Sequence, residues 1–140
     1  MANAVFPLGR EGFLLGEIDW DTAVFKVILI RGYTYDATDK FVADLTGATV
    51  AATSAALGTK TGTLGTADAA DITFTAVAAN ASNHSLVVYQ ASAVGGGADV
   101  ATSAQRLVSF YDTGTLLPVV PNGGDITIQW DSGTNRIFTL

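Results

Sequence analysis

The 140-residue sequence contains no cysteine, and this absence excludes several kinds of site at once. A chain without thiols forms neither disulfide cross-links nor thiolate metal sites, and it has no cysteine nucleophile. A domain of this length buries about 68–70% of the surface that its unfolded chain exposes, so it can fold without such cross-links. We therefore expect a single domain that spans residues 1–140.

Charged residues are also scarce. They make up 14% of the chain, whereas about 25% is usual for a soluble domain, and apolar residues reach 49%. Either small uncharged residues cover the outside of the molecule, or other copies of the chain and a partner cover part of it. We favour the second interpretation, which predicts an assembly.

Basic residues are few and dispersed along the chain. Seven of them face thirteen acidic residues, which gives a formal net charge of -6. Affinity for nucleic acid and for anionic membranes depends on clustered lysine and arginine, so we expect neither partner.

The chain has no long hydrophobic run. The longest one, AVFKVILI at 23–30, is interrupted by Lys26 and is far shorter than the ~20 residues of a membrane-spanning helix. The first residues, MANAVFPLGREGF, have neither a basic segment nor a continuous apolar segment, so we expect no signal peptide. These patterns favour a soluble protein or a component of a soluble particle.

Short runs of β-branched and aromatic residues dominate what is present. Residues 22–31 are apolar on both faces apart from Lys26, which predicts a central strand that is covered on both sides. Residues 1–18 predict a short helix or an arm, with Pro7 in its first turn. Further strands are predicted at 71–79, 84–92, 104–112, 125–131 and 136–140. The pattern as a whole predicts an all-β fold, an antiparallel β-sandwich or a curved barrel with a short N-terminal helix or arm.

Two segments rich in small residues are expected to be irregular. Residues 47–68 form a low-complexity Gly/Ala/Thr segment, which we interpret as a loop leading into a thin strand. Residues 94–99, VGGGAD, lack the lysine of a phosphate-binding loop and are interpreted as a flexible connector. Before both segments, residues 39–45 predict a single helical turn.

Alternation within the strands predicts which side chains share a face. In 71–79, Ile72, Phe74 and Ala76 are expected on one face. In 104–112, Leu107 and Ser109 are expected on one face and Val108 and Phe110 on the other.

The last two predicted strands have a similar explanation. Ile126, Ile128 and Trp130 are expected to face the core together. The D-S-G-T-N sequence that follows is typical of a hairpin, so we expect residues 136–140 to pair back onto 125–131.

Residues with catalytic potential are not grouped in the sequence. The single histidine, His84, begins a predicted strand after the turn NASN, and we interpret it as a surface or turn residue. No serine lies in a G-x-S-x-G sequence, so the nucleophile elbow is absent, and no spacing supports a Ser–His–Asp triad. We expect no enzyme and no catalytic, cofactor-binding or metal site.

Acidic residues leave some alternatives open. Asp19 and Asp21 could be paired carboxylates, but we favour a turn before the central strand. Capping and solvated loops explain Asp36, Asp39 and Asp44 better than a cation site. A calcium ion held by Asp112, Asp125 and Asp131 is a less favoured alternative to ordinary strand ends.

Several segments together resemble a known family. They are GEIDWDTAVFKVILI, YTYDATDKFVADLTG, LVVYQAS, LVSFYDTG, GGDITIQWD and RIFTL. In this order, from about Gly16 to Leu140, they resemble the strands and turns of small virion structural proteins of tailed bacteriophages, of the capsid cement or decoration type. Residues 47–68 and 92–102 depart from that pattern towards small residues.

The resemblance implies a structural component of the phage particle. The protein would bind the lattice of the major capsid protein as a homo-oligomer, often a trimer, and stabilise the head. It would act in the virion, assembled in the host cytoplasm. Within the arm, Phe6, Phe13 and Leu14 are the residues that we expect at the interface.

An alternative is a tail or fibre protein, either an adaptor or a carbohydrate-binding tip. Sugar rings stack on aromatic faces, so an exposed Trp20 or Trp130 would favour a carbohydrate-binding tip. We expect Trp130 to be a core residue instead, because it shares a face with two isoleucines.

Overall fold

The computed structural model describes residues 3–114, 117–133 and 136–140. Its largest sheet has the strand order β1 (Ala4–Val5), β10 (Leu107–Tyr111), β7 (Ser85–Gln90), β2 (Phe25–Arg31) and β3 (Thr49–Thr53). All neighbouring strands are antiparallel. The predicted central position of 22–31 is confirmed, because β2 pairs on both sides, with β7 and β3.

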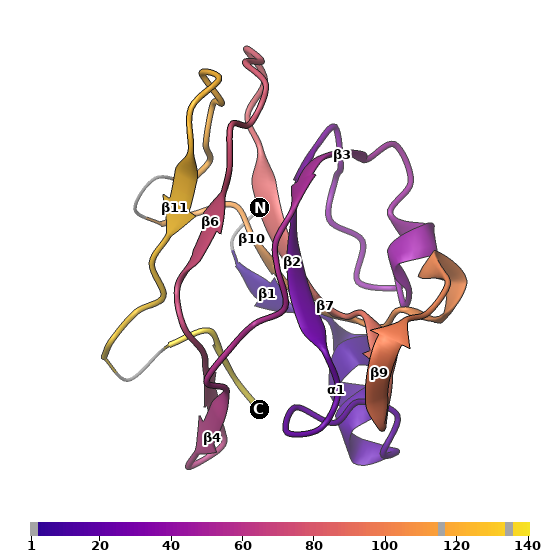
Figure 1. The fold of residues 1–140 in the computed structure, drawn as a ribbon. Coiled ribbons are helices and arrows are strands. Elements are labelled where there is room, and N and C mark those ends of the chain that lie inside the picture. The colour runs from indigo at the N-terminus through magenta and orange to yellow at the C-terminus, as the bar shows by residue number, and fades with distance from the viewer. Residues whose placement is uncertain (1–2, 115–116, 134–135) are drawn as a thin grey trace.

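Smaller sheets lie across one face of this main sheet (Figure 1). One pairs β6 (Ile72–Phe74) with β11 (Ile126–Ile128), and the other has the order β12 (Phe138–Thr139), β5 (Thr66–Asp68) and β4 (Thr61–Thr63). A separate hairpin consists of β8 (Ser92–Ala93) and β9 (Gly96–Asp99). The fold is therefore mostly antiparallel β and sandwich-like, as the sequence predicted.

Helical structure is short. Helix α1 (Pro7–Leu14) has Pro7 in its first turn, as predicted. The 3-10 turn η1 (Val42–Asp44) lies within the helical turn predicted at 39–45, and a second, η2 (Thr102–Ala104), precedes β10.

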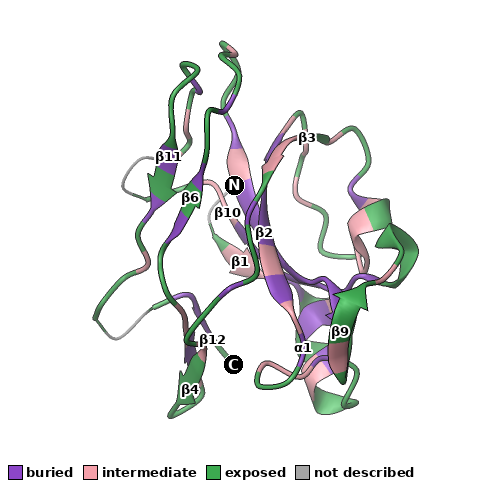
Figure 2. Cartoon of the chain, in the orientation of Figure 1, coloured by how far each residue is buried: buried purple, intermediate pink, exposed green. Residues whose placement is uncertain are grey.

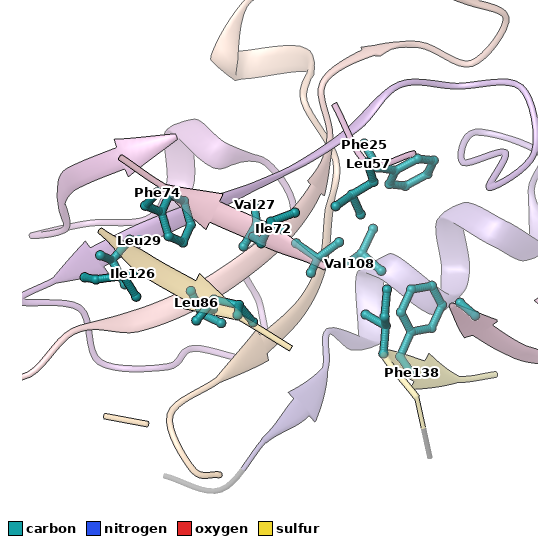
Figure 3. Packing of buried hydrophobic residues seen from close by; sticks show 14 of the residues in the cluster. Phe25, Val27, Leu29, Leu57, Ile72, Phe74, Leu86, Val108, Ile126 and Phe138 are labelled. Atoms are coloured by element: carbon teal, nitrogen blue, oxygen red, sulfur yellow. The ribbon is translucent and has the colours of Figure 1, made fainter. Parts of the chain in front are cut away.

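Strand β2 is covered on both faces, which explains why it is apolar apart from Lys26 and Arg31. Phe25, Val27 and Leu29 face the smaller sheets and belong to the first core cluster, together with Phe74 and Ile126 (Figure 3). Successive strand residues alternate between faces, so Ile28 and Ile30 contribute to a second cluster on the opposite side. Figure 2 shows this burial along β2 and the contrast with the exposed hairpin at β4.

Two glycines allow α1 to lie directly against β10. A Cβ atom on Gly9 would come within 2.7 Å of the Leu107 carbonyl oxygen, and one on Gly12 within 2.6 Å of both the Arg106 and Ile18 side chains. Both glycines are buried. Glycine lowers helix propensity, but here its missing side chain is what permits the contact.

A bulge changes the faces predicted for β10. The register between β10 and β7 shifts between Leu107 and Ser109. As a result, Leu107 and Phe110 share the second cluster, while Val108 faces the first. The predicted pairing of Val108 with Phe110 on one face is wrong, because an extra residue in one strand interrupts strict alternation.

The C-terminal pairing also differs from the prediction. Strand β12 pairs with β5 through Phe138 and Ala67, and β11 pairs with β6 instead of β12. Residues 134–135 of the predicted hairpin turn lie outside the described residues. Strand β6 is shorter than predicted, since Ala76 is exposed with a φ of 46° and Val77 is buried in its place.

The segments of small residues are more regular than predicted. Residues 47–68 contain β3 and the β4–β5 hairpin, so they hold three strands. The 94–99 segment is part of the β8–β9 hairpin and not a free connector. Backbone hydrogen bonding along threonine- and alanine-rich strands supplies the regularity that side-chain patterning does not reveal.

Candidate functional site

His84 is a buried structural residue. Its side chain is completely buried, its Nδ1 lies 2.8 Å from the Ser82 carbonyl oxygen, and its backbone forms a two-way bridge with Val119 at 2.8 and 3.2 Å. The prediction of a surface position is wrong, because the chain around Val119 returns to pair with the start of β7. This histidine has no access to a substrate in solution.

The acidic residues make local turns. The Asp19 carboxylate accepts hydrogen bonds from the Thr22 hydroxyl at 2.6 Å and from the backbone N–H groups of Asp21 and Thr22 at 2.9 and 3.3 Å. These bonds, the Thr22 hydroxyl first, lower the pKa of Asp19. The predicted turn before the central strand is confirmed.

Other carboxylates singled out in the sequence also accept hydrogen bonds, from near or from distant segments. Asp44 accepts hydrogen bonds from the backbone of Lys40 and Phe41, and Asp125 accepts one from Ala76. Asp39 accepts a hydrogen bond from the Tyr33 hydroxyl at 2.6 Å. Across 3–114, 117–133 and 136–140, no three His, Asp or Glu side chains are grouped as ligands for a metal ion.

The structure separates the three residues that we expected at an interface. Phe6 is completely buried in the second cluster, where its ring centroid lies 5.1 Å from that of Tyr35. Phe13 is half-buried, with its ring centroid 5.8 Å from that of Phe138. Phe6 therefore has no surface to offer a partner, whereas Leu14 is 87% exposed.

Three further leucines are exposed on elements that connect to α1, and we call the four together the leucine end. It consists of Leu14, Leu15, Leu64 and Leu140, which are 87%, 62%, 97% and 56% exposed. The elements that carry them are in contact, because Phe13 packs on Phe138 and β12 pairs with β5 of the β4–β5 hairpin. Figure 1 shows α1, β4 and the C-terminus at the same end of the molecule.

Leu64 is the most unusual residue of the leucine end. It occupies the two-residue turn between β4 and β5, with a φ of 53°, and Gly65 follows with a φ of 78°. Such turns favour asparagine, aspartate or glycine, because a side chain at positive φ is strained. Within the described chain, Leu64 therefore gains neither burial nor a favourable backbone conformation.

The support beneath the leucine end is held by hydrogen bonds and ring contacts. The Trp20 indole donates a hydrogen bond to the Thr61 carbonyl at 2.9 Å, and its ring packs against Phe25 and Phe138 at centroid distances of 4.7 and 5.3 Å. Lys60 lies over the Trp20 and Phe25 rings, at 5.7 and 5.1 Å, and donates to the Ala23 carbonyl at 2.5 Å. Burial lowers the pKa of Lys60. Trp20 thus serves packing and fixes the base of the β4–β5 hairpin.

A pocket of about 560 Å³ opens elsewhere, beside Trp130. Its lining includes Tyr111, Trp130 and Arg136, with Leu86 and Ile137 at the apolar side. Trp130 packs against the first cluster but is only half-buried, so it is not the core residue that was predicted, and β11 ends before it at Ile128.

The sequence analysis named Leu14 as an interface candidate but did not name Leu15, Leu64 or Leu140. The signal for Leu64 was available in the sequence TLGT, where a leucine precedes glycine between two threonines. Reading it as a hairpin turn required the pairing of β4 with β5, which the thin pattern of small residues did not reveal.

Comparison with known proteins finds no match among family models, curated proteins or solved structures. Among the described residues, no helix is both long enough and apolar enough to cross a membrane.

Proposed function

We propose that this chain is a structural component of a tailed-phage particle, a cement or decoration protein without catalytic activity. It docks on the major capsid protein lattice through the leucine end and stabilises the head. The observation that carries the proposal is Leu64, an apolar side chain 97% exposed on a turn that disfavours it. The resemblance of the strand segments to small virion proteins supports the same role.

The energetics of the leucine end favour docking on a lattice over a single isolated contact. The four exposed fractions amount to about three whole leucine side chains, or about 6 kcal/mol if each contributes about 2 kcal/mol on burial. Association itself costs an estimated 4–15 kcal/mol in lost translational and rotational freedom. One subunit would therefore bind weakly through these leucines alone.

Oligomerisation would overcome this weakness. When one subunit of an oligomer is bound, the others face their sites at a high effective concentration, which raises the overall affinity by about 10²–10⁴. A homo-oligomer, such as a trimer at a junction of capsomers, would thus hold the lattice with individually weak contacts. The scarcity of charge, 14% of residues, also suits a protein that is covered in part by its neighbours.

A binding experiment on particles tests the proposal. Particles that lack the protein would be incubated with purified wild-type or Leu64→Asn protein, and occupancy would be measured by cryo-electron microscopy and gel densitometry. We expect regular density on the head for the wild type and clearly reduced occupancy for Leu64→Asn. Val120→Asn is the matched control, because Val120 is 51% exposed beside the Val119–His84 bridge and away from the leucine end.

A tail or fibre location is the second candidate, and the pocket beside Trp130 favours it. A pocket of about 560 Å³ that contains an aromatic wall could hold a receptor group. The same images separate the two candidates, since density at the tail with none on the head would support the second and contradict the first.

A further inference from the structure

The pocket beside Trp130 has the make-up of a ligand site and lies apart from the leucine end. It opens between β10, which contributes Tyr111, and the chain that follows β11, which contributes Trp130. None of the four exposed leucines lines it. Its volume of about 560 Å³ lies within the ~300–1,000 Å³ typical of small-molecule sites.

The aromatic wall of the pocket is held in place before any ligand arrives. The Trp130 indole donates to the Ala70 carbonyl at 3.1 Å, and its backbone N–H donates to the Asp71 carboxylate at 2.9 Å. The Tyr111 ring lies 6.2 Å from the Trp130 ring, and its hydroxyl donates to the Ile137 carbonyl. Rings that are fixed in this way lose little rotamer freedom on binding.

The lining combines apolar and polar groups. Leu86, Ile128 and Ile137 supply an apolar part, while Arg136 and Asp131 supply charged groups of opposite sign. Arg136 is also paired with the Asp68 carboxylate, so its positive charge is already balanced. A pocket without a dominant charge does not select an ion, and its mixed lining suits a ligand with one apolar face and several hydroxyl groups.

From this arrangement we propose that the pocket binds a neutral pyranose sugar, whose C–H face packs on the Trp130 ring. Aromatic side chains with one apolar face and one polar end are suited to such contacts. The sugar hydroxyls would replace water at the polar lining near Arg136 and Asp131. This inference deepens the tail or fibre alternative by naming a ligand class, and it does not depend on docking at the leucine end.

Nuclear magnetic resonance on the purified protein tests the inference. The two tryptophans, Trp20 and Trp130, give two indole N–H signals, which the variant Trp20→Phe assigns. Glucose, galactose and N-acetylglucosamine would be titrated one at a time into the millimolar range. We expect at least one of them to shift the Trp130 signal in a saturable way while the Trp20 signal stays in place.

Variants separate a pyranose site from a non-specific effect. Trp130→Ala should abolish the sugar-induced shifts of neighbouring backbone signals, and Arg136→Gln should weaken binding about 5-fold or more while leaving the thermal melting curve close to that of the wild type. Arg136→Gln provides the test if Trp130→Ala does not fold. The inference is overturned if no sugar moves the Trp130 signal, or if Arg136→Gln binds sugar as the wild type does.

The outcome is distinguishable from failure of the proposed function. Leu64→Asn protein should bind sugar like the wild type, because Leu64 does not line the pocket. Conversely, loss of sugar binding in Arg136→Gln should leave occupancy on the head unchanged. A protein that decorates heads but binds no sugar would retain the proposed function and lose this inference.

Discussion

Replacing Leu64 by asparagine should raise the stability of the isolated protein and lower its affinity for the particle. Leucine at a φ of 53° is strained by about 1–2 kcal/mol relative to residues that accept the left-handed conformation. Asparagine is among the residues preferred in such a two-residue turn. Because Leu64 is 97% exposed, its removal takes no contact from the core. A stabilisation of about 1 kcal/mol would raise the Tm by about 3–5 °C in a domain of this size.

The same substitution should weaken docking. Burial of a whole leucine side chain contributes about 2 kcal/mol, which corresponds to about a 30-fold change in the dissociation constant of a single site. Thermal unfolding of the purified protein measures the first effect, and occupancy of particles measures the second. If Leu64 has no role in binding, its substitution will change neither the occupancy of particles nor the affinity for them.

A second variant separates backbone strain from the loss of the side chain. Leu64→Ala removes most of the apolar surface but keeps a Cβ atom at positive φ, so we expect weaker docking without the gain in Tm. The reasoning is refuted if Leu64→Asn lowers the Tm, or if it raises the Tm and leaves particle occupancy at the wild-type value.

Three further substitutions test the fold. Phe6→Ala should lower the free energy of unfolding by about 3–5 kcal/mol, measured by urea titration, because Phe6 is completely buried; a loss below about 1 kcal/mol would contradict its core position. Gly9→Ala should destabilise the fold by about 1–3 kcal/mol despite the higher helix propensity of alanine, because its Cβ would meet the Leu107 carbonyl at 2.7 Å. The control is Gly58→Ala, whose Cβ would have no neighbour within 4 Å. Equal melting temperatures for the two variants would refute the close contact at Gly9. Asp19 has a lowered pKa in the folded state, so its stabilising effect is complete above the ordinary value of 3.8 and is lost as the pH falls below that value. Asp19→Asn should therefore flatten the pH dependence of the Tm below pH 3.8, and an unchanged slope would contradict the role of the turn.

Local patterns in the sequence were sufficient for the strands that form the middle of the main sheet. Phe25 to Ile30 are apolar at every position except Lys26, and only a strand covered on both sides accommodates such a run. Residues 84–92 predicted β7, and the alternation of Ile126 and Ile128 predicted β11. These predictions succeeded because successive side chains of a strand point to opposite faces, so a few adjacent residues show which faces are buried.

Partners of strands were harder to predict because they depend on residues far apart in the chain. The hairpin expected between β11 and β12 rested on turn residues alone, yet β12 finds its partner in β5, about seventy residues earlier. The bulge in β10 likewise depends on its register with β7, and it moved Phe110 to the face of Leu107.

The candidate sites show the same division. The sequence by itself determined that no cysteine chemistry is possible and that charged residues are scarce. Its β-forming residues and the alternation of apolar with polar positions predicted the antiparallel β fold. Only the tertiary structure decided that Phe6 is buried, that Leu64 stands exposed on a strained turn, and that Trp130 and Arg136 line one pocket. The physical reason is that exposure and proximity follow from which distant segments pack together, and packing is a property of the whole folded chain.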